Sequence, residues 1–224
     1  MGIALTYTSQ HLEEGFPGNL QVRVCYEINN YNQWSISYEA TTDHTTMLNL
    51  TQHTYFNLTG HDHRNILNHS FETSASHILL ANERQIPTGE FMEIKNTPFD
   101  FSSSKAIGED IDSKNEQLLT SRGYDHYFVL EKTKTNELKY GGSVKDLSGL
   151  TMNFHTTEPG FHFYTGNFLD TFIGKEKKRY NMRSGFCIET HNFPDAPNHS
   201  HFPSAILRPG TTYKSRTIFQ FITT

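Results

Sequence analysis

The chain has 224 residues, a length that suits one large domain or two small ones and allows a sizeable core. Its formal net charge of −5 at pH 7 argues against a nucleic-acid partner, because nucleic-acid-binding proteins present basic surfaces. No stretch is long and apolar enough to span a membrane, and the N-terminal residues lack the pattern of a signal peptide. We therefore expect a cytoplasmic protein with no membrane partner.

Two alternating segments near the N-terminus predict a β-hairpin. Residues 20–27, LQVRVCYE, and residues 34–40, WSISYEA, each alternate apolar side chains with polar or small ones. The turn-rich sequence INNYNQ joins them. A second hairpin is predicted where ELKYGGSVKD and LTMNFHTT flank the turn at residues 147–149.

One short helix is predicted between these hairpins. The sequence Ser113-Lys114-Asn115-Glu116 has the S-x-x-E form of a capping box and precedes two leucines. Proline and glycine punctuate the rest of the chain, which has no internal repeat and no break in composition. These features predict an all-β protein, a large antiparallel β-sandwich, with residues 1–224 forming a single domain.

The cysteines and histidines show no spacing typical of a metal site. Cys25 and Cys187 are too few for a disulfide framework, and both lie in predicted strands, where we expect small buried side chains. The densest histidine cluster, His61-Asp62-His63, lies in a polar, turn-rich stretch that favours a solvated loop. We assign no metal and expect no cofactor.

Glu189 follows the apolar run GFCI at residues 185–188 and precedes a loop rich in His, Asn and Pro. A glutamate in a strand commonly points to water, but one held against apolar side chains has a raised pKa and can act as a base near neutral pH. Three more polar side chains lie in strands or strand ends rich in Phe and Tyr: His53, Asp125 and His162. Aromatic rings with a few polar groups are typical of sugar sites. Taken singly, these three also fit a structural histidine, a turn-forming aspartate and an exposed strand residue.

Four longer segments together resemble the aldose 1-epimerase family. They are NLTQHTYFNLTG (49–60), GYDHYFVL (123–130), TTEPGFHFYTGNFLD (156–170) and SGFCIETHNFPDAPNHSHFPSAILRPGTTY (184–213). The resemblance implies a β-sandwich of the galactose mutarotase type. It also implies an isomerase that interconverts the α and β anomers of galactose or glucose by acid/base ring opening. A catalytically silent carbohydrate-binding relative, or a gene fragment, is the alternative.

The resemblance also implies roles for single residues. Glu189 occupies the position of the family's catalytic base, and His53 occupies that of its general acid. Asp125 occupies a position that binds sugar hydroxyls. At a further binding position the family commonly carries Gln, where this chain has His162, which also donates and accepts hydrogen bonds. One base and one acid on opposite sides of the sugar suffice, because ring opening takes a proton from the C1 hydroxyl and gives one to the ring oxygen.

Part of the sugar site that the resemblance implies has no counterpart in this sequence. The family domain has an N-terminal part with an Asn-Arg stretch and a His-Gly-Gly loop that help to hold the sugar, and neither string occurs in these 224 residues. We therefore expect an N-terminally truncated fold with weakened activity. We also expect self-association through exposed sheet edges. The sequence leaves open which aldose is preferred.

Overall fold

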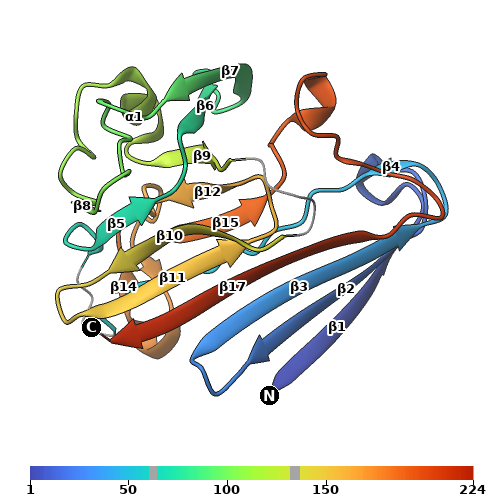
Figure 1. Cartoon of the computed structure of the whole chain (residues 1–224), viewed down its shortest axis with the longest axis horizontal. Helices are drawn as coiled ribbons and strands as arrows, with labels where there is room; N and C mark the ends of the chain where they lie inside the picture. The colour runs from blue at the N-terminus through green and yellow to red at the C-terminus, as the bar shows by residue number, and fades with distance from the viewer. Residues whose placement is uncertain (61–64, 132–136, 224) are drawn as a thin grey trace.

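Two antiparallel sheets, packed face to face, form the body of the molecule (Figure 1). The computed structural model describes residues 1–60, 65–131 and 137–223. All strand pairings in this described part are antiparallel. The prediction of a large antiparallel β-sandwich is therefore confirmed.

The larger sheet joins strands from both ends of the chain. In spatial order its eight strands are β1 (Gly2–Ser9), β2 (Leu20–Ile28), β3 (Gln33–Thr42), β17 (Tyr213–Thr223), β11 (Leu150–Thr156), β10 (Lys139–Lys145), β5 (Ser70–Thr73) and β8 (Lys105–Ala106). The pairs β2–β3 and β10–β11 are the two hairpins predicted from alternation. Strand β17 connects the hairpins, because it pairs with β3 on one side and with β11 on the other.

The smaller sheet has five strands and packs against the larger one through a shared core. In spatial order they are β15 (Cys187–His191), β12 (Gly160–Tyr164), β9 (Asp125–Val129), β6 (His77–Ala81) and β7 (Pro87–Glu93). Outside the two sheets lie the ladders β13 (Phe172–Ile173) with β14 (Arg179–Tyr180) and β16 (Ile206–Leu207) with β4 (Thr46–Met47), and the 3₁₀ turns η1 (Glu13–Gly15), η2 (Lys175–Lys177) and η3 (Ala196–Asn198).

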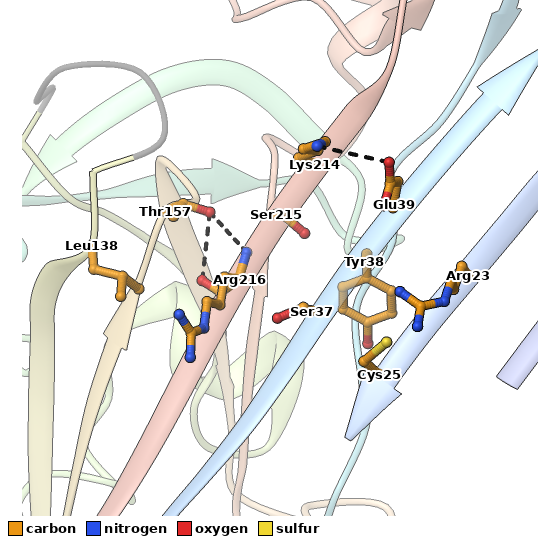
Figure 2. A pocket seen from close by; sticks show the side chains of 10 residues that line it. All are labelled: Arg23, Cys25, Ser37, Tyr38, Glu39, Leu138, Thr157, Lys214, Ser215 and Arg216. Atoms are coloured by element: carbon orange, nitrogen blue, oxygen red, sulfur yellow. Dashed lines mark hydrogen bonds and ion pairs between the residues drawn. The ribbon is translucent and has the colours of Figure 1, made fainter. Parts of the chain in front are cut away.

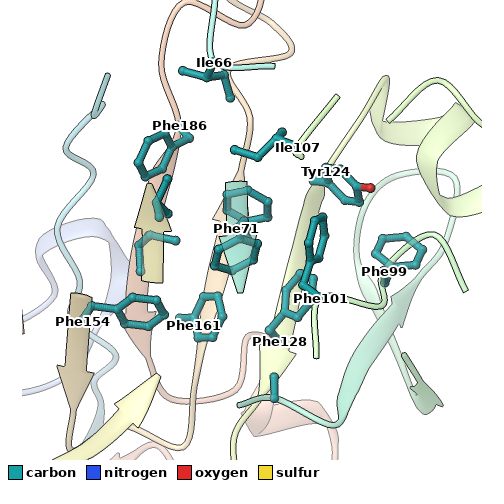
Figure 3. Close-up of a cluster of buried hydrophobic side chains, with 14 of the residues drawn as sticks. Ile66, Phe71, Phe99, Phe101, Ile107, Tyr124, Phe128, Phe154, Phe161 and Phe186 are labelled. Carbon is teal, nitrogen blue, oxygen red and sulfur yellow. The ribbon is translucent and has the colours of Figure 1, made fainter. Parts of the chain in front are cut away.

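Aromatic rings fill the space between the sheets (Figure 3). Phe161 and Phe163 of β12 are fully buried, and their ring centroids lie 6.3 and 4.4 Å from that of Phe71 in the larger sheet. Phe128 of β9 stacks on Phe161 at 5.5 Å with an interplanar angle of 8°. Each such burial contributes about 1.5–3 kcal/mol. Because side chains alternate along a strand, burying these rings turns the residues between them outward.

The α-helix α1 (Glu116–Ser121) is short, as predicted, but the predicted capping box is wrong. Asn115 is the N-cap, and its side-chain oxygen accepts a hydrogen bond of 3.0 Å from the backbone N–H of Gln117. Ser113 lies before the helix. The side chain of Gln117 in turn bonds both backbone groups of Ala81, which attaches the helix to β6.

The cysteines both lie in strands and are free, but only one is fully buried. Cys187 is buried, whereas Cys25 is half-buried, so the expectation of burial is wrong for Cys25. The cluster at 61–63 lies outside the described residues. Among the residues that the structure describes, no helix has the length and apolar character needed to cross a membrane.

Strand β1 forms one edge of the larger sheet and carries exposed apolar side chains. Within the described part of the chain it pairs with β2 alone. Ile3, Leu5 and Tyr7 are 59, 49 and 59% exposed. Leu5 pairs directly with Val24, which packs against the core, so these three side chains lie on the core-facing side of the sheet. The larger sheet therefore extends beyond the part of its inner face that the core covers.

Candidate active site

The outward face of the smaller sheet carries the candidate site, because strand register aligns its polar side chains in rows. Glu189 of β15 pairs directly with His162 of β12. In the next row, Tyr164 pairs with Cys187 on one side and with Asp125 on the other. Residues opposite each other in neighbouring strands point to the same face. Three strands that are far apart in the sequence thus present one continuous polar surface.

His53 reaches this surface from an irregular segment that follows β4, not from the strand-like setting that we expected. Gln52 Nε2 donates a hydrogen bond of 2.7 Å to the backbone carbonyl of Ile188, and Gln52 Oε1 accepts one from the backbone N–H of Thr54. A little further on, Phe56 forms an antiparallel bridge with Phe186. Contacts on both sides of His53 therefore hold its ring beside β15.

All four predicted site residues line one pocket. His53 Nε2 lies 3.5 Å from Glu189 Oε1. His162 Nε2 lies 2.8 Å from Asp125 Oδ1. The pocket has a volume of about 350 Å³, in the range of small-molecule sites, and its lining is completed by Tyr55, Tyr164, His191 and Pro194. Two histidine–carboxylate pairs therefore face one space of the size that a small ligand needs.

The setting of Glu189 favours a strong base. Its side chain is only 13% exposed, and burial raises the pKa of the carboxyl group above its ordinary value. The neighbouring side chains of His162 and His53 oppose this rise, and the Asp125 carboxylate adds to it. A raised pKa makes the carboxylate a better proton acceptor, while the half-exposed ring of His53 remains open to the pocket.

Sequence reasoning missed four of the lining residues, namely Tyr55, Tyr164, His191 and Pro194. Burial lowers the pKa of His191 to about 4, so its ring is neutral at neutral pH. Nδ1 of this ring lies against the backbone carbonyl of Asn192. It therefore donates there and leaves Nε2 as an acceptor. The signal was present in the sequence, because His191 lies two residues after Glu189 in one strand and so shares its face.

A second pocket, also of about 350 Å³, lies on the larger sheet (Figure 2). Strand register places Arg23, Glu39 and Lys214 in one row on the face that points away from the core. Glu39 is 49% exposed and lies 3.7 Å from Lys214 Nζ. This exposed carboxylate opposite a lysine differs from the first pocket, where a largely buried carboxylate lies beside a histidine. We therefore take the first pocket as the candidate active site.

Similarity to known proteins covers almost the whole chain. The chain is 40% identical over 98% of its length to galactose mutarotase from Sus scrofa, and it spans 63% of the length of that protein. It is 34% identical to aldose 1-epimerase from Escherichia coli (strain K12), again over 98% of its length, and spans 64% of that relative.

Solved structures of related proteins share the fold. An aldose epimerase homologue from C. elegans superposes with a TM-score of 0.88 at 28% identity, over 99% of this chain and 66% of that one. A galactose 1-epimerase from Lactobacillus acidophilus NCFM has the same fold, with a TM-score of 0.86 at 24% identity, over 99% of this chain and 63% of that one. The family model for aldose 1-epimerase matches residues 1–220. This chain therefore belongs to the aldose 1-epimerase family.

Proposed function

We propose that this chain interconverts the α and β anomers of an aldose, galactose or glucose. The observation that carries the proposal is the distance of 3.5 Å between His53 Nε2 and Glu189 Oε1 inside the candidate pocket. Anomer exchange needs a base at the C1 hydroxyl and an acid at the ring oxygen. Both oxygens are bonded to C1, so two groups that lie close together can act on both.

Glu189 is the proposed base and His53 the proposed acid. Glu189 takes the proton of the C1 hydroxyl while protonated His53 gives one to the ring oxygen. The bond between C1 and the ring oxygen breaks, and C1 becomes an aldehyde. After rotation about C1–C2, His53 takes the proton back from the chain hydroxyl and Glu189 returns its proton to the aldehyde oxygen. Ring closure then gives the other anomer, and both side chains recover their starting states.

Asp125 and His162 are the proposed sugar-binding residues. The hydrogen bond between His162 Nε2 and Asp125 Oδ1 leaves the second carboxylate oxygen of Asp125 for a sugar hydroxyl. The aromatic faces of Tyr55 and Tyr164, which also line the pocket, suit the C–H face of a pyranose.

Three further proposals concern the 224-residue chain as a whole. These residues contain neither the Asn-Arg nor the His-Gly-Gly string, so we propose that they by themselves form a weak epimerase with a high KM. We propose self-association through the exposed apolar side of β1. We propose the cytoplasm as its compartment, which agrees with two free cysteines.

Polarimetry on freshly dissolved α-galactose and α-glucose tests the activity. The wild type should speed mutarotation above the spontaneous rate, and Glu189→Gln should not, because an amide cannot accept the C1 proton. Glu39→Gln, which changes a carboxylate in the second pocket, should behave as the wild type does. Wild-type traces identical to buffer would overturn the epimerase proposal. Sugar binding without turnover would then favour the silent carbohydrate-binding protein.

A further inference from the structure

The candidate pocket adjoins a third reactive group, which the acid/base reaction does not use. The Sγ atom of Cys187 lies 3.4 Å from His53 Nδ1, and Glu189 Oε1 lies 3.5 Å from Nε2 of the same ring. Cys187 is fully buried and forms no disulfide. Strand register turns its side chain to the same face of the sheet as those of Tyr164 and Asp125, which line the pocket. The thiol therefore lies next to the pocket, in contact with the ring of His53.

We propose that His53, Cys187 and Glu189 form a binding site for zinc or a similar borderline-soft divalent cation, which competes with the sugar. Each residue offers one ligand atom, and these atoms lie within 4.8 Å of one another; no other set of three such side chains does so in the described part of the chain. Imidazole nitrogen, thiolate sulfur and carboxylate oxygen are all ligands that zinc takes. The inhibitory consequence rests on the proposed epimerase function, whereas the binding itself does not.

The spacing of the side chains suits a tetrahedral ion. Zinc binds nitrogen at about 2.0–2.1 Å and sulfur at about 2.3 Å, so two such donors on one tetrahedral ion lie roughly 3.5 Å apart. His53 Nδ1 and Cys187 Sγ are already 3.4 Å apart. The carboxylate of Glu189 lies 3.5 Å from Nε2 of the same ring and must turn toward Nδ1 to become the third ligand. The fourth position is then left for a water molecule.

The charges also suit a divalent ion. Burial raises the pKa of the Cys187 thiol, so the thiol carries its proton when no metal is bound. Binding releases that proton to solvent, and the positive charge of the ion stabilises the thiolate that remains. The thiolate and the Glu189 carboxylate together neutralise the ion. An occupied site leaves neither His53 nor Glu189 able to transfer protons, so the ion should act as a reversible inhibitor.

Cobalt(II) titration followed by absorption spectroscopy tests the binding without any sugar. Cobalt bound to a thiolate gives a sulfur-to-metal charge-transfer band in the near ultraviolet. The wild type and Cys25→Ala, which removes only the distant cysteine of β2, should both show the band and lose it when zinc is added. Cys187→Ala should not show it, and His53→Ala should weaken cobalt binding by at least about tenfold. Circular dichroism spectra and melting curves would establish that each variant is folded.

Either of two results would overturn the proposal. One is a wild type that binds cobalt with no charge-transfer band, and the other is a band that persists in folded Cys187→Ala. Mutarotation assays supply the second arm, in which zinc should raise the apparent KM and EDTA should reverse the effect. Relative to its own metal-free rate, Cys187→Ala should need at least about tenfold more zinc for the same inhibition. Because the cobalt spectrum requires no turnover, an inactive protein would contradict the epimerase proposal and leave the metal site testable.

Discussion

His162 Nε2 and Asp125 Oδ1 lie 2.8 Å apart, so a histidine of β12 holds the carboxylate that we propose binds sugar hydroxyls. His162 also lies directly across from Glu189 in the sheet. The ring of His162 therefore holds the carboxylate of Asp125 in place within the pocket. A change at His162 should appear in sugar binding.

Replacing His162 with alanine should therefore raise the KM for sugar by more than it lowers kcat. The change leaves Asp125 without the hydrogen bond of 2.8 Å that holds its carboxylate. His162→Gln, which can still donate a hydrogen bond to Asp125, should restore most of the wild-type KM. The measurement is mutarotation kinetics, with His155→Ala of β11 in the larger sheet as the control. A KM for His162→Ala equal to that of the wild type would contradict this positioning role.

Replacing His53 with asparagine should lower kcat by about 10²–10⁴ with a smaller change in KM, because a positioned acid contributes that much to a proton transfer. The matched control is His44→Asn, which breaks a histidine–carboxylate contact of 2.8 Å with Asp43 on the exposed surface. The control should keep the wild-type kcat. If His53→Asn instead raised KM alone, His53 would be a binding residue and another group would be the acid.

Replacing Glu189 with glutamine should stabilise the fold above the ordinary pKa of a glutamate. Burial raises the pKa of Glu189, so the folded protein binds this proton more tightly than the unfolded chain does. The corresponding stability is fully present below the unfolded pKa and is lost as pH rises through the folded pKa. Glutamine does not ionise, so Glu189→Gln should melt above the wild type near pH 8, by about 2–4 °C for each kcal/mol that burying the charge costs.

Melting curves recorded from pH 4 to 8 check this expectation. The advantage of Glu189→Gln over the wild type should shrink toward pH 4, where the wild-type carboxyl group is also neutral. A variant that melts below the wild type at pH 8 would show that the contact of Glu189 with His53 outweighs the cost of burying the charge.

Replacing Leu5 with lysine should reduce self-association. Leu5 is 49% exposed on the core-facing side of β1, and a lysine there should disfavour the packing of a second apolar surface. Light scattering over a range of concentrations measures the effect. Thr6→Lys, which places the charge on the opposite face of the same strand, is the control and should reduce association less. A wild-type protein that stays monomeric at every concentration would rule out association through β1.

Local patterns in the sequence predicted two hairpins of the larger sheet and the sandwich class. Alternation at residues 20–27 and 34–40 predicted the β2–β3 hairpin, because a strand with one buried face must repeat every two residues. The helix start was misplaced, because Ser113 and Asn115 are both good capping residues and local sequence alone does not choose between them. Tertiary contacts chose Asn115, since the bonds from Gln117 to Ala81 attach the first turn to β6.

Four residues of the candidate site could be predicted from the sequence, because His53, Asp125, His162 and Glu189 lie in long segments that resemble one family. How their side chains meet depends on the tertiary structure. Strand register sets His162 opposite Glu189, and the hydrogen bond from Gln52 to Ile188 brings His53 beside β15. Contacts between residues so far apart in the chain depend on how the sheets pack, which no local pattern specifies. The approach of Cys187 to His53 follows from the same packing, so it could be found only in the folded molecule.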